Sequence, residues 1–232
     1  YLNKNLKLTF TDENTGEVKT YQEEFGIQSY VKYINREATT IHDDIIYIEG
    51  KSGDIEVEIA FQYTNSYTEQ INSYCNRINL VDGGTLVTGF KMALTRIMNQ
   101  YARELNVLKG KDENFDGKDI RNGIVAIISI KHPDPQFESQ TKNKLGNTDA
   151  KTAVDDVMNL EAQRYFDKNV EVLKKILDNA LKSYQARRAS DKARTAVLKQ
   201  LNDVETKSKL AACSSKKPAE CEVYIVEGDS AG

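Results

Sequence analysis

The chain contains 232 residues, 39% of them hydrophobic and 29% charged, with a net charge of −3; this size suits one large or two small domains, and the overall charge does not indicate a nucleic-acid-binding protein. No run of about 18 apolar residues is present, so we expect no membrane-spanning helix. The cysteines (Cys75, Cys213 and Cys221) form no CxxC pair, which argues against a disulfide framework or a zinc site and favours a reducing compartment.

The first half of the chain predicts a hairpin, a short helix and two strands. Apolar and polar residues alternate on both sides of a turn at residues 12–16, which predicts a hairpin. Between residues 27 and 34, apolar residues recur at the spacing of an amphipathic helix. Residues 45–48 are apolar, and residues 55–63 alternate strictly, as in a strand with one polar face. Residues 64–88 read as irregular.

The second half predicts long helices around one buried strand. Apolar residues follow helical spacing from about residue 89 to residue 105. Residues 124–130 are apolar and mostly β-branched, as in a strand that is buried on both faces. Helical spacing returns at residues 154–160, breaks at the polar residues 167–169 and resumes from residue 173 to about residue 200. Because strands and helices are mixed along the chain, the sequence predicts an α+β or α/β fold.

The C-terminal residues indicate the start of a second domain. Residues 202–219 contain few apolar side chains and read as a linker. Residues 224–226 are apolar and predict a strand, which is followed at once by Glu227, Gly228 and Asp229. Small residues beside a carboxylate at a strand end are typical of the phosphate and metal sites of open α/β sheets. We therefore expect this chain to be a middle piece of a larger protein.

Glu227 is the first candidate for chemistry. A carboxylate at a strand end can bind Mg²⁺, which prefers oxygen ligands, or act as a general acid or base. The alternative is structural, because Asp229 or Ser230 can simply cap a helix. One carboxylate does not complete a magnesium site, so we expect further ligands beyond Gly232.

The polar loop at residues 133–147 is the second candidate. Gln140, Thr141 and Lys142 offer an amide, a hydroxyl and an ammonium between a predicted strand and a predicted helix. Such a set can bind a phosphate, with the lysine as a point charge and the glutamine as a neutral donor. On the tripeptide alone, a solvated surface loop is the commoner explanation.

Basic helix faces are the third candidate. Basic side chains, including Arg187 and Arg188, outnumber acidic ones between residues 170 and 200, and Arg96 lies on the preceding long helix. Phosphate backbones of nucleic acids attract such faces, although a solvated helix face is the commoner explanation. The isolated histidines, His42 and His132, read as surface or packing residues.

Several runs of sequence together resemble one family. The runs DGGTLVTGFKMALTRIMNQYARE (82–104), RNGIVAIISIKHPDPQFESQTKNKLGN (121–147) and KLAACSSKKPAECEVYIVEGDSAG (209–232) are similar to the B subunits of bacterial DNA gyrases. The resemblance covers nearly the whole chain in one order. The B subunits of the sister enzyme, topoisomerase IV, are closely similar and remain an alternative.

The resemblance implies a fold and its boundaries. Residues 1–200 would form an α+β transducer domain of the GHKL-type ATPase region, a small sheet packed by helices with a left-handed βαβ crossover. Residues 201–219 would be a linker, and residues 220–232 the first strand and acidic motif of a Toprim domain.

The resemblance also implies an activity, namely ATP-dependent DNA strand passage by a type II topoisomerase. Gln140 and Lys142 would contact the γ-phosphate of ATP bound in the preceding domain, and Glu227 would bind Mg²⁺ during DNA cleavage and religation. Arg96, Arg187 and Arg188 would face double-stranded DNA. The partners would be the gyrase A subunit and a second B subunit, in a bacterial cytoplasm or a plastid-type organelle, and this chain alone would be inactive.

The sequence departs from the family pattern in two places. Leu86 stands where the family usually has a histidine, so a polar role at that position is in doubt. A Pro-Gly pair common before the KLA run is absent, so the linker is expected to differ in shape.

The alternative function is that of a non-enzymatic binding module, since related folds occur in chaperones and ribosomal proteins. The Glu-Gly-Asp-Ser run after the last predicted strand argues against it.

Overall fold

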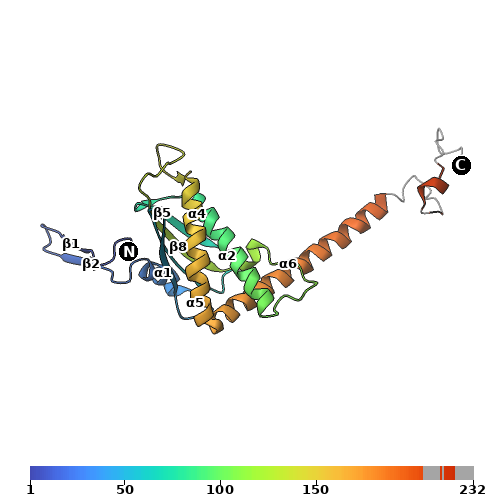
Figure 1. Cartoon of the computed structure of the whole chain (residues 1–232), viewed down its shortest axis with the longest axis horizontal. Helices are drawn as coiled ribbons and strands as arrows, with labels where there is room; N and C mark the ends of the chain where they lie inside the picture. The colour runs from blue at the N-terminus through green and yellow to red at the C-terminus, as the bar shows by residue number, and fades with distance from the viewer. Residues whose placement is uncertain (206–214, 216, 223–232) are drawn as a thin grey trace. The chain divides into compact units, whose positions relative to one another are not determined.

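The computed structural model describes residues 1–205, 215 and 217–222 (Figure 1). The chain separates into two compact units, Tyr1–Gln185 and Ala186–Gly232. The second unit contains the C-terminal part of helix α6 (Val170–Glu205) and the 3-10 helix η3 (Pro218–Glu220). Within the described ranges, no helix is long and apolar enough to cross a membrane.

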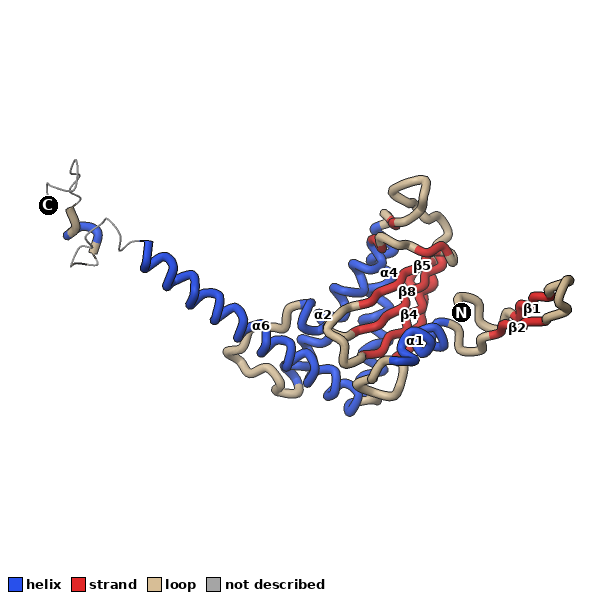
Figure 2. Tube along the Cα trace, turned by 180° about the vertical axis from the view of Figure 1, so that it is seen from behind, coloured by secondary structure: helices blue, strands red, loops and turns tan. Residues whose placement is uncertain are grey.

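A five-stranded sheet forms the centre of the first unit (Figure 2). Its strand order is β3 (Ile46–Ser52), β4 (Ile55–Tyr63), β8 (Ile124–Lys131), β5 (Gln70–Cys75) and β6 (Ile78–Asn79). Neighbouring strands are antiparallel except β5 and β8, which are parallel and connected through helix α2 (Thr85–Glu104). The fold therefore mixes strands and helices as predicted, while the handedness of the β5–α2–β8 crossover stays a prediction.

Residues 70–75 form strand β5, although the sequence predicts that residues 64–88 are irregular. Its sequence, Gln-Ile-Asn-Ser-Tyr-Cys, shows neither a continuous apolar run nor a clean alternation. The strand is held by its ladder with β8, in which Gln70 lies opposite Val125 and Cys75 lies opposite Ile130. Pairing with a strongly β-forming neighbour therefore decides the structure where local preference is weak.

Helices cover both faces of the sheet (Figure 2). Helix α1 (Ile27–Ile34) packs on one face, where Ile27 and Val31 join a small apolar cluster. The larger core on the other face is formed with α2, α4 (Thr148–Val157), the π-helical turn η2 (Met158–Ala162), α5 (Gln163–Lys168) and the first turns of α6.

The alternation of β4 explains this division. Val57, Ile59 and Phe61 point into the larger core, and Ala60 points toward α1. On the α1 side, the buried Gln62 accepts a hydrogen bond from Asn35 Nδ2 (2.9 Å) and donates one to the His42 carbonyl (2.9 Å). Part of the polar face that the sequence predicts is thus buried against polar partners, as buried amides require.

Some helix ends agree with the sequence prediction and others differ from it. The predicted break is confirmed at Asn169, whose φ of −125° and ψ of 54° separate α5 from α6. Helix α2 begins at Thr85, one turn earlier than predicted, because Gly84 ends the preceding strand. Helix α6 runs unbroken to Glu205, so the first residues of the predicted linker are helical. The proposed domain boundaries stay predictions.

The first residues form the predicted hairpin, β1 (Lys7–Thr11) and β2 (Val18–Gln22). Its turn is set by the Asp12 carboxylate, which accepts the Asn14 N–H (2.8 Å). The remaining short elements are η1 (Asn35–Glu37), β7 (Gly83–Gly84), α3 (Gly117–Ile120) and β9 (Lys144–Leu145).

Candidate functional site

The predicted phosphate-binding loop joins β8 to α4 and extends beyond the body of the first unit, near the top of Figure 1. Strand β9 ties its return limb to β7 in a parallel pair, and the Glu138 N–H donates to the Lys144 carbonyl (3.0 Å) across the two limbs. The loop is therefore a narrow hairpin with a fixed base, whose tip comprises residues 139–143.

The tip is a tight turn that exposes the three predicted side chains. The Lys142 N–H donates to the Ser139 carbonyl (3.1 Å), and Lys142 itself adopts a left-handed φ of 56°. The hydroxyls of Ser139 and Thr141 lie 2.7 Å apart. Gln140, Thr141 and Lys142 are all exposed, which leaves their polar groups accessible to a ligand outside this chain.

The Lys142 ammonium lies 5.6 Å from the centroid of the Phe137 ring, a cation–π distance. No described carboxylate lies within ion-pair distance of it, whereas the neighbouring Lys144 pairs with Glu138 at 3.0 Å. An exposed ammonium beside an exposed amide suits an anionic oxygen group such as a phosphate.

The base of the loop contacts the start of α2. Gly83 and Gly84 have φ values of 68° and 129°, and a Cβ atom on Gly84 would lie 2.3 Å from the Leu145 carbonyl oxygen. Only glycine allows this approach. The Gly-Gly pair is therefore a backbone device that places the hairpin against α2. Leu86 is fully buried in the core, so its side chain supplies no polar group at this place.

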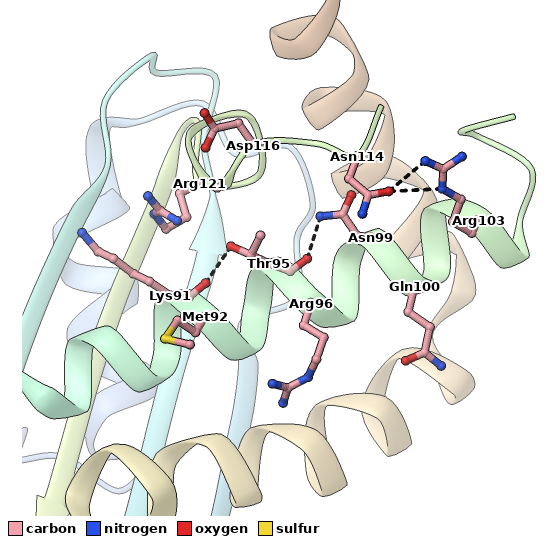
Figure 3. A pocket seen from close by; sticks show the side chains of 11 residues that line it. Lys91, Met92, Thr95, Arg96, Asn99, Gln100, Arg103, Asn114, Asp116 and Arg121 are labelled. Atoms are coloured by element: carbon pink, nitrogen blue, oxygen red, sulfur yellow. Dashed lines mark hydrogen bonds between the residues drawn. The ribbon is translucent and has the colours of Figure 1, made fainter. Parts of the chain in front are cut away.

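A basic groove of about 770 Å³ runs beside α2 (Figure 3). Lys91, Thr95 and Arg96 line it from α2, and Asp116 and Arg121 line it from the segment before β8. Glu69 pairs with both Lys91 (2.5 Å) and Arg121 (2.7 Å), so one carboxylate balances part of the positive charge within the chain.

Arg96, a predicted DNA contact, is engaged with a neighbouring helix. Its Nη2 atom donates to both carboxylate oxygens of Asp155 at 3.0 Å, and its side chain is 47% exposed. In the second unit, Arg187 lies 4.0 Å from Asp191, and both Arg187 and Arg188 are half-buried. Arg96 and Asp155 neutralise one another in this arrangement, so a phosphate would have to compete with that carboxylate.

Glu227, the predicted Mg²⁺ ligand, lies outside the described residues. Across residues 1–205, 215 and 217–222, no group of three or more histidine, cysteine, aspartate or glutamate side chains is arranged to hold a metal ion. The described residues therefore supply donors for an anion, at Gln140 and Lys142, but no metal centre.

Comparisons with known proteins identify the family. A family model described as DNA gyrase B matches residues 26–196. The chain is 45% identical to the B subunit of a DNA gyrase from Bacillus mycoides and 46% identical to that of Thermotoga maritima. Both alignments include this entire chain, which spans 58% of the first protein and 38% of the second.

Solved structures agree with this. The 43K ATPase domain of Thermus thermophilus gyrase B, solved with an aminocoumarin, is 35% identical with a TM-score of 0.78, and the match covers 84% of this chain and 53% of that one. A topoisomerase IV ATP-binding domain of Francisella tularensis is 27% identical with a TM-score of 0.61, over 78% of this chain and 49% of that one. Because the family model and the relatives match most of its length, this chain belongs to the DNA gyrase B family.

Proposed function

We propose that this chain is the part of a type II topoisomerase B subunit that relays the state of a bound ATP to DNA strand passage. The observation that carries the proposal is the exposed amide and ammonium at the tip of a hairpin with a fixed base. Gyrase B relatives aligned over the whole chain support the class of protein, although the chain spans only 37–58% of the relatives' length.

Gln140 and Lys142 would contact the γ-phosphate of ATP bound in another part of the subunit. An ammonium and an amide donate to phosphate oxygens, and the bond from the ammonium is charge-assisted. Such a contact exists with ATP and is lost once the terminal phosphate leaves. A ligand that binds one conformation better than another shifts the population toward it, so this contact would favour a closed arrangement before hydrolysis.

The route from the tip into the body of the first unit would be the backbone pairing of β9 with β7. Strand β7 leads directly into α2, which runs beside the basic groove. A displacement of the loop would therefore act on α2 through hydrogen-bonded backbone rather than through flexible side chains.

The wider assembly follows from the family. The subunit would act with a gyrase A subunit, a second B subunit and double-stranded DNA in the bacterial cytoplasm, or in a plastid-type organelle. Arg187 and Arg188 would face DNA, and Arg96 would do so once a DNA phosphate displaces the Asp155 carboxylate. Glu227 would hold Mg²⁺, whose chemistry in such sites is to stabilise charge during phosphoryl transfer. Gyrase is favoured over topoisomerase IV because the curated relatives at 42–46% identity are named gyrase B.

Replacement of Lys142 by alanine in the full-length protein tests the proposal. We expect ATP hydrolysis to fall by roughly 100-fold, the usual cost of removing one donor to developing charge, while nucleotide binding stays largely intact. The matched control is Lys144→Ala, which removes another exposed lysine, paired with Glu138, in the same hairpin. Unchanged turnover in the Lys142 variant would refute the role of the loop.

A further inference from the structure

His132 lies immediately after β8, where the loop that carries Gln140 and Lys142 begins. Its side chain is only 3% exposed, although the loop beyond it is largely exposed. A buried imidazole needs partners for its ring nitrogens. Here the ring and the backbone of His132 together bond to three separate parts of the chain.

The backbone of His132 is held by Asn76, in the turn between β5 and β6. The Asn76 side chain accepts the His132 N–H (2.9 Å) and donates to the His132 carbonyl (2.8 Å). Asn76 has a left-handed φ of 49°, and its own N–H donates to the Ile130 carbonyl (2.9 Å). The side chain of Asn76 thus extends the hydrogen-bond pattern of the sheet by one residue beyond the end of β8.

The imidazole joins the start of the loop to the start of α4. Its Nδ1 atom accepts the Asp134 N–H (3.1 Å), so in the neutral ring the proton is on Nε2, which donates to the Asp149 carboxylate (3.1 Å). This bond is the main cause of the lowered pKa of Asp149. Asp149 lies in the first turn of α4, where a carboxylate is also favoured by the helix dipole.

Asn147, at the other end of the loop, bonds to residues near its beginning. Its Oδ1 atom accepts the Gln136 N–H (2.5 Å), and its Nδ2 atom donates to the Asp134 carbonyl (3.2 Å). The two limbs are thereby joined where they leave the body of the protein, next to His132 and Asp149.

We infer that His132, fixed by Asn76 and bonded to Asp149, is a positioning residue that sets the reach of Gln140 and Lys142 toward the terminal phosphate of ATP. This inference rests on the proposed function of the loop. His132 does not touch the nucleotide and acts only through the hairpin. A contact that must be made within fractions of an ångström depends on such a supporting layer.

The experiment uses the full-length protein with ATP and with ADP as probes. Asp149→Ala removes the partner of His132 Nε2 by truncating a side chain that is itself 61% exposed, so no buried side chain is replaced. We expect kcat for ATP hydrolysis to fall roughly tenfold, because small misplacements of a catalytic contact are costly, while the affinity for ADP stays unchanged. His132→Ala should act alike, and His132→Gln, which keeps a donor of similar reach, should retain most of the activity.

The matched control is Asp156→Ala, which removes another carboxylate of α4, bonded to Ser52 Oγ (2.8 Å), and should leave kcat unchanged. Each substitution is also combined with Lys142→Ala. If His132 acts through the loop, Asp149→Ala loses its effect in that background, because interacting residues are not additive.

Two failures are distinguishable in this design. If Lys142→Ala leaves turnover unchanged, the proposed function of the loop fails. If Lys142→Ala lowers turnover but the Asp149 and His132 variants do not, or lower it equally in both backgrounds, the positioning role is overturned while the proposed function stands. A fall in ADP affinity or failure of His132→Gln to retain activity likewise overturns it.

Discussion

His42 shows how a buried histidine can be fixed in its neutral form. The side chain is almost fully buried, its Nδ1 atom donates to the Asp44 carbonyl (2.7 Å), and its Nε2 atom accepts the Tyr63 N–H (3.1 Å). Protonation would set an N–H of the ring against the N–H of Tyr63. Burial is the main cause that lowers the pKa of His42. The hydrogen bond to the Asp44 backbone and the Asp44 charge oppose it, and the charges of Lys175, which lowers the pKa, and Asp43, which raises it, have smaller effects.

We expect this histidine to make the fold less stable in mild acid. In the unfolded chain it binds a proton below about pH 6.5, whereas in the folded chain it resists protonation until a lower pH. Its contribution is therefore fully present above pH 6.5 and is lost as the pH falls toward its folded pKa, by about 1.4 kcal/mol for each pH unit in that window.

The measurement is urea unfolding of the chain and of His42→Gln between pH 7.5 and pH 5.5. Other groups also titrate in this range, so the informative quantity is the difference between the two slopes. The variant should lose less stability on acidification, and equal slopes would contradict the assignment.

At the residue scale, the sequence predicted which polar side chains are exposed better than which ones form hydrogen bonds in the interior. The tip residues Gln140 and Lys142 are exposed, as a polar loop between a strand and a helix implies. The pattern gave only packing or surface roles for His42 and His132. Their partners include a backbone group of Tyr63 and the side chain of Asp149, which are distant in the chain and carry no spacing signal.

At the element scale, the junction of β7, β9 and α2 depends on one glycine. Replacement of Gly84 by alanine would place Cβ 2.3 Å from the Leu145 oxygen and 2.7 Å from the Leu145 nitrogen, at a φ of 129°. Relief requires the hairpin to move away from α2. We expect the free energy of unfolding to fall by more than about 2 kcal/mol, because backbone strain of about 1–3 kcal/mol is added to the loss of the β7–β9 pairing.

The matched control is Gly53→Ala, at a φ of 58° with no atom within 4 Å of the added Cβ. This variant has the strain of a left-handed conformation without the clash, so we expect its free energy of unfolding to fall by only about 1 kcal/mol. The two free energies of unfolding are compared in urea. Equal losses would mean that the approach of Leu145 to Gly84 contributes nothing.

The same scale shows where sequence patterns succeed. The alternation of residues 55–63 and the β-branched run from residue 124 predicted β4 and β8, because both strands bury most of their side chains. Strand β5 and the start of α2 were missed. Their formation depends on the β8 ladder and on the contact of Gly84 with Leu145, which join residues far apart in sequence.

At the scale of the whole molecule, the parallel strands β5 and β8 are neighbours in the sheet. The crossover that connects them contains both β7 and α2. The loop after β8 then returns to β7 through β9. The hairpin tip and the groove beside α2 are therefore both attached to one crossover unit. This arrangement suits a relay, because its parts are joined by strand pairing and helix packing.

A relay that holds only part of the nucleotide contacts should not turn over nucleotide by itself. The candidate donors described here, Gln140 and Lys142, suit a terminal phosphate, and the described residues contain no metal-binding cluster. Neither feature recognises a base or a ribose, and phosphoryl transfer requires an oriented nucleophile and a metal as well. We therefore expect residues 1–232 to show neither ATP hydrolysis nor DNA cleavage, measured beside the full-length protein at equal concentration with Mg²⁺ and supercoiled plasmid. Robust turnover by this chain alone would mean that a complete nucleotide site lies within it, and the assignment of the loop to a site shared with another part of the protein would then be wrong.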